Sequence, residues 1–385
     1  MRRAVRNAAS GAGLAPSRSD ATAELTFVEG GTWFHHRRLY RFCFLLAAVS
    51  ENQEMTAPPV ATTVSRDRGD ISVSRPRRAL VLINDAAGSG KEAQDRSTGI
   101  KTSFARHGVD ATVRPLRGPD IAEAAKGFAA QRSDEGRRGD EVLVAAGGDG
   151  TISAAAGALA GTGVPLGILP LGTLNHFAKD LGLPLDLDGA TGIIAAGQTR
   201  QVDLAELNGR VFVNNSSVGL YPFMVARRTA EQRRHGVGKW LATVPAMVQT
   251  LGEASWHHLE ITAPGEHEVV RTPCVFVGNN PYELGLKAFG SRRRLDGGEL
   301  DVHVIRQQSR TGVLLLPVKI ALGICDRERD VHVFRSATLE ITSRKRRSLG
   351  VSLDGEVMHM TTPLRYRSRP GDLRVFCGPA QAPAG

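Results

Sequence analysis

The chain has 385 residues, of which 41% are hydrophobic and 23% charged, and its formal net charge is +10. This length suggests two domains, and the composition excludes collagen-like and low-complexity chains. The positive charge favours anionic partners such as anionic lipid or phosphorylated metabolites. Nucleic acid is not expected, because only 5% of the residues are aromatic and they are not interleaved with the basic clusters.

The first 77 residues lack sustained periodicity and are rich in Ala, Ser, Thr, Gly and Arg. Up to Arg78 there are 12 arginines and 7 acidic residues, so about half of the net charge lies there. The apolar run Leu39 to Val49 contains Arg41 and is far shorter than the ~20 residues that span a bilayer. We expect residues 1–77 to be a disordered or mis-assigned leader ahead of a start at Met55, with a membrane-touching basic leader as the alternative.

A regular alternation of compact apolar runs and helical patterns begins at Arg78. The predicted strands are 78–84, 110–114, 141–146 and 166–169, and the predicted helices are a stretch after Gly90 that runs through Arg106, 121–131 and 152–160. Short apolar runs of this kind are typical of buried parallel strands. Residues 78–203 are therefore predicted to form an α/β nucleotide-binding domain with a mainly parallel sheet.

From residue 204 the pattern changes to strands with few helices between them. The predicted strands are 211–215, 256–262, 272–277, 300–305, 331–341 and 351–353, and the predicted helices are 237–251 and 311–324. This pattern predicts a β-rich domain over residues 204–378, a sandwich or a barrel, followed by a tail at 379–385.

The strongest chemical motif is Gly147-Gly148-Asp149-Gly150-Thr151, placed between a predicted strand and a helix. Ligands of open α/β sheets bind at the carboxyl ends of the strands. Consecutive glycines let backbone N–H groups approach a phosphate, and Thr151 can cap the helix or bind a phosphate oxygen. Asp149 would be repelled by bare phosphate, which implies a bridging Mg²⁺ or a substrate hydroxyl. The alternative is a tight glycine turn capped by an aspartate.

A second loop, 170–178, follows the next predicted strand and also leads into a helix. Gly172 and Thr173 could form a second wall of a nucleotide pocket, and Asn175 offers both a donor and an acceptor. The alternative is an ordinary helix start with Thr or Asn as its N-cap.

These two motifs, followed by Leu353-Asp354-Gly355-Glu356, together resemble the diacylglycerol kinase catalytic-domain family, which includes bacterial lipid kinases and sphingosine kinases. The resemblance covers residues 78–378. It implies an α/β nucleotide domain and a C-terminal β-sandwich-like domain, with the active site in the cleft between them. The last strands, from about Tyr366, would return to the first domain.

The resemblance also implies roles for individual residues. The first motif and Thr173 would contact ATP, Asn84 would open the nucleotide pocket, and Glu356 would be the general base. From residue chemistry we add the hypothesis that Asp149 works through Mg²⁺ and that Asp354 orients the acceptor hydroxyl or shares the metal. Taken alone, Asp354-Gly355-Glu356 also fits a plain hairpin turn.

The sequence departs from the family pattern at Asp85, His176 and Gly297. His176 replaces an aspartate common after the asparagine, and Gly297 replaces the second aspartate of an accessory Mg²⁺ site. That metal site is therefore expected to be lost, or rebuilt from Asp296 and Glu299.

Three functions fit these features. The leading prediction is an ATP-dependent lipid kinase that phosphorylates diacylglycerol, a sphingoid base or a similar neutral lipid, in phospholipid or other lipid metabolism. The alternatives are an NAD kinase-like enzyme with a soluble substrate, and a nucleotide- or lipid-binding regulator without turnover.

We expect a cytoplasmic protein that touches the inner face of the membrane peripherally. Four scattered cysteines fit a reducing cytosol. Several cationic clusters could hold the chain on anionic lipid, although each is also typical of a solvated surface; they are 227–228, 233–235, 292–294 and 344–347.

Overall fold

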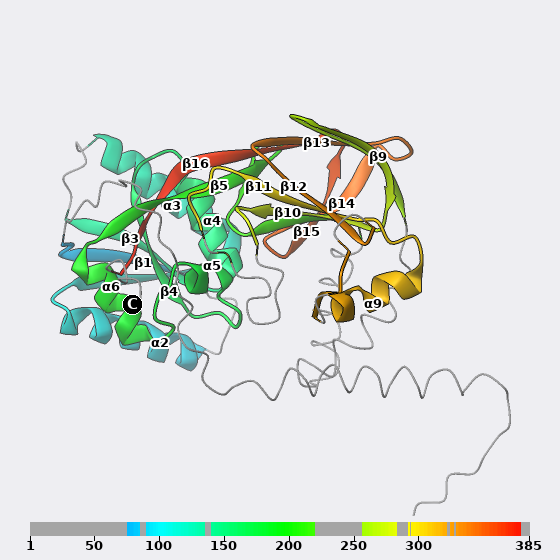
Figure 1. Ribbon diagram of the computed structural model, residues 1–385. Coiled ribbons are helices and arrows are strands. Elements are labelled where there is room, and N and C mark those ends of the chain that lie inside the picture. The colour runs from blue at the N-terminus through cyan, green and yellow to red at the C-terminus, as the bar shows by residue number, and fades with distance from the viewer. Residues whose placement is uncertain are drawn as a thin grey trace, which may run out of the picture. The chain divides into compact units, whose positions relative to one another are not determined.

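The computed structural model describes residues 75–84, 90–134, 140–219, 256–282, 292, 294–321, 324–326 and 329–378 (Figure 1). The predicted leader up to residue 74, Asp85, the predicted helix 237–251, the clusters 227–228 and 233–235 and the predicted tail 379–385 lie outside these ranges.

The first part of the described chain is an α/β fold, as predicted. Its parallel strands lie in the order β2-β1-β3-β4 and are β1 (Arg78–Asn84), β2 (Asp110–Leu116), β3 (Glu141–Gly147) and β4 (Pro165–Pro170). The helices are α2 (Gly90–Arg106), α3 (Gly118–Asp134), α4 (Asp149–Leu159), α5 (His176–Asp180) and α6 (Leu187–Ala196).

Helices cover both faces of this sheet, because alternate strand residues point to opposite sides. On β1, Val81 and Ile83 belong to the core cluster that includes Phe104 of α2. Leu82 belongs to a second cluster that includes Ile121 of α3. Burial on both faces explains why these strands appear in the sequence as continuous apolar runs.

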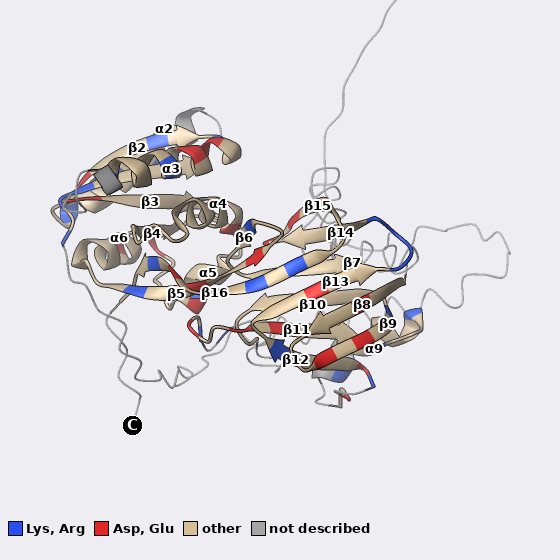
Figure 2. Ribbon diagram, turned by 90° about the horizontal axis from the view of Figure 1, so that it is seen from above, with Lys and Arg blue, Asp and Glu red and all other residues tan. Residues whose placement is uncertain are grey.

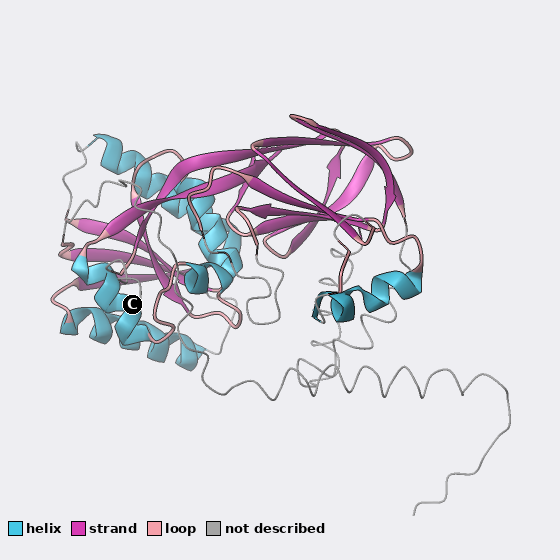
Figure 3. Ribbon diagram, viewed as in Figure 1, coloured by secondary structure: helices cyan, strands magenta, loops and turns pink. Residues whose placement is uncertain are grey.

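The remaining strands form a sandwich of two layers, whose strands are magenta in Figure 3. The two layers share an apolar core. One layer has the order β12-β11-β10-β7-β14-β15; its strands are β7 (Asn215–Gly219), β10 (Cys274–Asn279), β11 (Leu300–Ile305), β12 (Val331–Ser336), β14 (Ser348–Leu353) and β15 (Glu356–Thr361). The other layer contains β5 (Thr199–Leu207), β6 (Arg210–Phe212), β8 (His257–Ala263), β9 (Glu266–Thr272), β13 (Thr338–Ser343) and β16 (Leu364–Phe376). Helix α9 (Arg310–Ala321) follows β11.

Strand β16 joins the two parts into one ten-stranded sheet. It pairs in parallel with β4 and antiparallel with β5 and β13. The division expected between residues 203 and 204 falls inside β5, and these domain bounds remain a prediction.

Three strands predicted as continuous are divided in the structure. The run 211–215 is split between β6 and β7, because residues 213 and 214 turn their N–H groups toward Asp354. The run 331–341 is split at Ala337, where the chain passes from one layer to the other. The run 272–277 is split at Pro273, which has no N–H to donate to a neighbouring strand.

Candidate active site

The glycine loop lies between β3, which ends at Gly147, and α4, which begins at Asp149. The N-cap of α4 is Gly148, and no side chain caps the helix. The expectation that Thr151 caps it is therefore wrong. Thr151 is 6% exposed, and a Cβ added to Gly147 would lie 2.5 Å from its Oγ1. Thr151 thus fills the space that glycine leaves open at Gly147.

The second loop packs directly against the first. The amide of Leu171 donates a 3.0 Å hydrogen bond to the carbonyl of Gly147. A Cβ added to Gly172 would lie 2.4 Å from the Cα of Gly148, so the two backbones approach as closely as glycine allows. Asp149 accepts a 3.3 Å hydrogen bond from the amide of Phe177 at the start of α5. The structure therefore brings together the first two predicted motifs.

Asn175 holds the second loop in shape. It adopts a left-handed conformation with φ of 49°, and its Nδ2 donates to the carbonyls of Pro170 and Gly172 at 3.1 and 2.9 Å. It occupies the N-cap position of α5 without a side-chain capping bond. Its Oδ1 is buried and has no hydrogen-bond partner within the described part of the chain. A ligand donor could satisfy this acceptor, because buried polar atoms are normally paired.

Two further predicted residues also lie at this edge of the sheet. Asn84 ends β1, and since Ile83 pairs with Ala146, it lies beside the end of β3. Thr173 is exposed in the second loop. Both residues lie at the edge of the sheet where the nucleotide is predicted to bind, and their role in binding it remains a prediction.

Glu356 is brought to the glycine loop from the far end of the sequence. It begins β15 after a two-residue turn, Asp354-Gly355, with φ of 47° and 88°. A Cβ added to Gly150 would lie 3.7 Å from its Oε1, and the Glu356 side chain is exposed. Glu356 of the third predicted motif therefore lies next to Gly150 of the first.

Asp354 is half-buried and its carboxylate is fully hydrogen bonded, whereas Glu356 is exposed. Its carboxylate accepts bonds from the amides of Val213, Asn214 and Asn215 at 2.8, 2.8 and 3.1 Å, and from the Ser153 hydroxyl. Burial raises the pKa of Asp354, and these donors oppose the rise. Ser153 is a site residue that the sequence did not single out, because inside α4 it looks like any small helix residue.

Arg292 bonds to the segment 213–214, whose amides also bond to Asp354. Its guanidinium forms a 2.7 Å ion pair with Asp180 of α5 and donates to the carbonyl of Val213 at 2.7 Å and to Oδ1 of Asn214 at 2.8 Å. Its side chain is 0% exposed. The interpretation of Arg292 as part of a surface cationic cluster is therefore wrong.

The Arg292 guanidinium also faces aromatic rings. It lies 5.8 Å from the ring centre of Phe177 and 5.5 Å from that of Tyr282. Burial raises the pKa of Tyr282 to about 12, so its hydroxyl stays neutral near pH 7. No local pattern in the sequence points to this cluster, because its partners come from separate segments.

The three predicted metal ligands are not gathered into one cluster. Within the described ranges, no three His, Cys, Asp or Glu side chains lie close enough to hold a metal ion. Asp296 pairs with Arg294 at 3.1 Å, and the backbone carbonyl of Glu299 accepts a 3.0 Å hydrogen bond from the amide of Asn280. The set Asp149, Asp296 and Glu299 remains a prediction.

Position 297 has no room for a side chain. The Gly297 amide donates to Oδ1 of Asn280 at 2.7 Å, and a Cβ added there would lie 2.7 Å from the same atom. Asn280 thus occupies the space that the family's second aspartate would need. Asp149 alone still suits a nucleotide-borne Mg²⁺, which is usually held by one or two carboxylates and the substrate phosphates.

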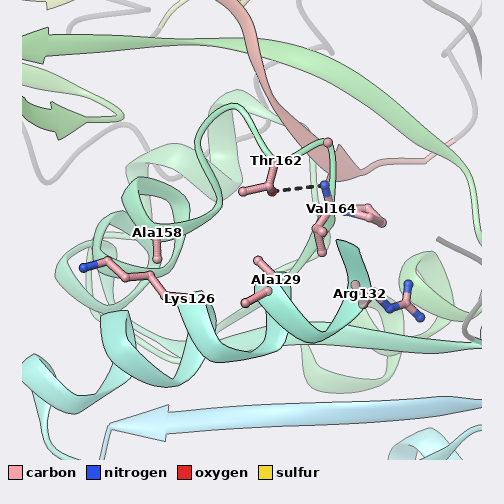
Figure 4. Close-up of a pocket in the computed structure, with 9 residues that line it drawn as sticks. Lys126, Ala129, Arg132, Ala158, Thr162 and Val164 are labelled. Atoms are coloured by element: carbon pink, nitrogen blue, oxygen red, sulfur yellow. Dashed lines mark hydrogen bonds between the residues drawn. The ribbon is translucent and has the colours of Figure 1, made fainter. Parts of the chain in front are cut away.

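A pocket of about 420 Å³ lies elsewhere, between α3 and α4 and the segment before β4 (Figure 4). Lys126, Ala129, Ala158 and Thr162 are among its lining residues, and it contains none of the predicted site residues. It opens near the amino end of β4, whereas the glycine loops lie at the carboxyl ends of the strands.

Comparison with known proteins agrees with this architecture. Residues 78–207 match the diacylglycerol kinase catalytic domain, and residues 223–377 match the YegS C-terminal NAD kinase beta sandwich-like domain. A protein named probable lipid kinase YegS-like from Pseudomonas syringae pv. tomato is 32% identical over 64% of this chain and 78% of its own length. Its namesake from Pseudomonas aeruginosa is 32% identical over 64% of this chain and 79% of its own length.

A solved structure described as a diacylglycerol kinase from Bacillus anthracis str. Sterne has the same fold. Its TM-score is 0.58 at 21% identity, covering 80% of this chain and 100% of that one. In the described part of this chain, no helix is both long and apolar enough to cross a bilayer. The two matched domains and the identity to the Pseudomonas proteins show that the chain belongs to the YegS-like lipid kinase family, with a diacylglycerol kinase catalytic domain.

Proposed function

We propose that the protein transfers the γ-phosphate of ATP to the hydroxyl of diacylglycerol or of a related neutral lipid or sphingoid base. One observation carries most of this proposal: the Glu356 carboxylate lies against Gly150, in the loop suited to nucleotide phosphates. A carboxylate next to the transferred phosphate is what an acceptor hydroxyl needs, because its proton must leave as the new bond forms.

In the proposed reaction, the glycine loops bind the ATP phosphates through backbone N–H groups. The lipid hydroxyl oxygen attacks the γ-phosphorus, the bond to the β-phosphate oxygen breaks, and ADP leaves. Glu356 accepts the hydroxyl proton. Mg²⁺ bound with the nucleotide would neutralise phosphate charge, and Asp149 is the residue best placed to hold it.

The lipid acceptor also implies contact with a membrane. The loop Arg344–Arg347 between β13 and β14 is exposed and cationic (Figure 2). Basic residues near an anionic surface contribute about 1 kcal/mol each to binding. We therefore propose peripheral association with anionic lipid, in phospholipid or other lipid metabolism.

Transfer of labelled phosphate tests the proposal. Full-length protein is incubated with γ-labelled ATP, Mg²⁺ and a panel of vesicles containing diacylglycerol, sphingosine or monoacylglycerol, beside NAD. Label in a lipid supports the proposal and identifies the acceptor. Label in NADP would instead support the soluble-substrate enzyme, and ATP binding without transfer would support a regulator.

A further inference from the structure

We propose that Asp354 is a positioning residue, which fixes the turn that presents Glu356 and does not itself touch the lipid hydroxyl or a metal ion. This inference rests on the proposed role of Glu356 as the general base. It assigns to Asp354 a function different from the one that its motif implies.

The first argument is that the carboxylate has no free acceptor position. An ionised carboxylate offers about four lone-pair sites on its two oxygens. Oδ1 accepts from the amides of Asn214 and Asn215, and Oδ2 accepts from the amide of Val213 and the hydroxyl of Ser153. Four protein donors therefore occupy the places where a metal or a substrate hydroxyl would bind.

The second argument is the geometry of the turn. Asp354 and Gly355 have positive φ, and Leu353 pairs with Glu356 across the hairpin. A two-residue turn of this kind sets the register and direction of the strand that follows. Since Asp354 is one of its two turn residues, fixing its side chain also fixes the first residue of β15, which is Glu356.

The third argument is what the donors are attached to. Ser153 lies on α4, the helix that begins in the glycine loop. Arg292 donates hydrogen bonds to Val213 and Asn214 of the segment 213–215. It also forms an ion pair with Asp180 of α5, the helix that follows the second loop. Asp354 thus connects the Glu356 turn to both loops that face the proposed nucleotide site.

The charge of Asp354 gives a readout of the turn that it holds. Burial raises its pKa, and the Ser153 hydroxyl is the leading opposing influence, followed by the three amides. Arg292 and Tyr282 are charged and titratable groups that interact with this charge. Removing the hydroxyl must raise the pKa of Asp354 further. Because protonated Asp354 places an O–H donor against the donors of the turn, the acid limb of the rate profile then moves to higher pH.

The experiment compares Ser153→Ala, Ser153→Thr and the wild type as full-length proteins across a pH series with ATP, Mg²⁺ and lipid vesicles. Ser103→Ala is the matched control, because Ser103 also contacts a carboxylate, Asp188, but lies on α2 away from the site. For Ser153→Ala we expect kcat to fall roughly 10- to 100-fold through misplacement of Glu356, with KM for ATP nearly unchanged. Its acid limb moves to higher pH, and Ser153→Thr restores most of kcat and the wild-type limb.

Two results would overturn the inference: an acid limb that stays at the wild-type pH in Ser153→Ala, or a kcat of this variant equal to that of the wild type. A second measurement does not need activity. Hydrogen exchange of the amides of Val213, Asn214 and Asn215 is expected to accelerate in Asp354→Asn, because the new amide group places an N–H donor against donors. Should that variant not fold, faster exchange at Val213 in Ser153→Ala gives the same information.

Unchanged exchange at these amides would show that Asp354 does not hold the turn, which refutes the inference. If the wild type transfers no phosphate to any acceptor, the proposed function fails, whereas the exchange data still decide whether Asp354 holds the turn.

Discussion

Two carboxylates at positions 354 and 356 have opposite surroundings. Glu356 is exposed and faces Gly150, whereas Asp354 is half-buried and its carboxylate is bonded to four donors. A proton acceptor must be reachable by the substrate, and a structural carboxylate must have its lone pairs satisfied. The surroundings of each carboxylate therefore indicate its role better than its position in the shared motif does.

Replacement of Glu356 by Gln is expected to remove the proton acceptor while keeping the shape of the side chain. Phosphate transfer should fall by roughly 100- to 10,000-fold, the range typical of general bases. ATP binding, measured by calorimetry, should stay close to that of the wild type. Glu340→Gln is the control, since Glu340 lies on β13 and pairs with Arg365 at the surface. Undiminished transfer by Glu356→Gln would exclude Glu356 as the base.

Arg292 is predicted to matter for stability. Arg292→Met would leave Asp180, whose side chain is 5% exposed, buried without its cation. Breaking a buried ion pair in this way costs about 3–5 kcal/mol. Urea unfolding should show a loss of this size, and the Arg294→Met control should cost about 1 kcal/mol or less, because its pair with Asp296 is exposed. Equal losses in the two variants would contradict the assignment of Arg292.

At the scale of elements, the contact between the two glycine loops is the tightest feature of the site. Gly172→Ala would force its Cβ to within 2.4 Å of the Gly148 backbone, so the loops must separate. We expect KM for ATP to rise at least tenfold, because misplaced backbone donors no longer fit the phosphates.

The Gly127→Ala variant tests whether this effect is local. Gly127 lies in α3, and a Cβ there has nothing within 4 Å. Alanine favours the helix by about 1 kcal/mol, so this variant should be slightly more stable, with an unchanged KM. Similar KM values for Gly172→Ala and the wild type would mean that the second loop does not shape the nucleotide site.

The sequence predicted the elements of the α/β part well because their signals are local. Buried parallel strands appear as apolar runs, and all four predicted ones occur within a few residues of their expected bounds. In the β-rich part, the break at Pro273 has a local cause in the missing N–H of proline, but the break at residues 213–214 depends on a tertiary contact. Nothing near residues 213–214 announces that a carboxylate at position 354 will bend the strand there.

The candidate site shows the same difference between residues with a local sequence signal and residues whose partners are distant in the chain. Its loops were predicted from glycines, and Glu356 from its motif. Ser153, Asp180 and Arg292 were not predicted, because their partners are far away in the chain. Arg292 in particular stands next to other arginines, which is a typical pattern of solvated surfaces. Only the folded chain shows that Arg292 is enclosed while Arg294 remains at the surface.

At the scale of the whole molecule, the exposed basic loop 344–347 predicts how the protein binds to the membrane that holds its proposed lipid substrate. Triple replacement of Lys345, Arg346 and Arg347 by Ala should weaken binding to anionic vesicles roughly 100-fold, since each basic residue contributes about 1 kcal/mol. Vesicle sedimentation at low salt measures this change. The effect should shrink as salt increases, because ions screen exposed charges.

A second triple variant controls for net charge alone. Arg114, Arg117 and Lys126 are also exposed but belong to the α/β part. Replacing them by Ala removes the same charge and should change vesicle binding by less than about threefold if location matters. Equal weakening by both triple variants would show that net charge alone drives the binding and would exclude the loop as a docking surface.

The position of β16 has a consequence for how the protein is made. During synthesis, β4 is complete near residue 170, yet the strand that covers its open edge is not finished until residue 376. Until then, a growing chain exposes unpaired backbone groups, which are templates for association with other chains. Pairing across so long a separation is also slow. The edge of β4 therefore stays uncovered until residue 376 has been made, and ribosome-bound fragments that end before β16 are the species most in need of a chaperone.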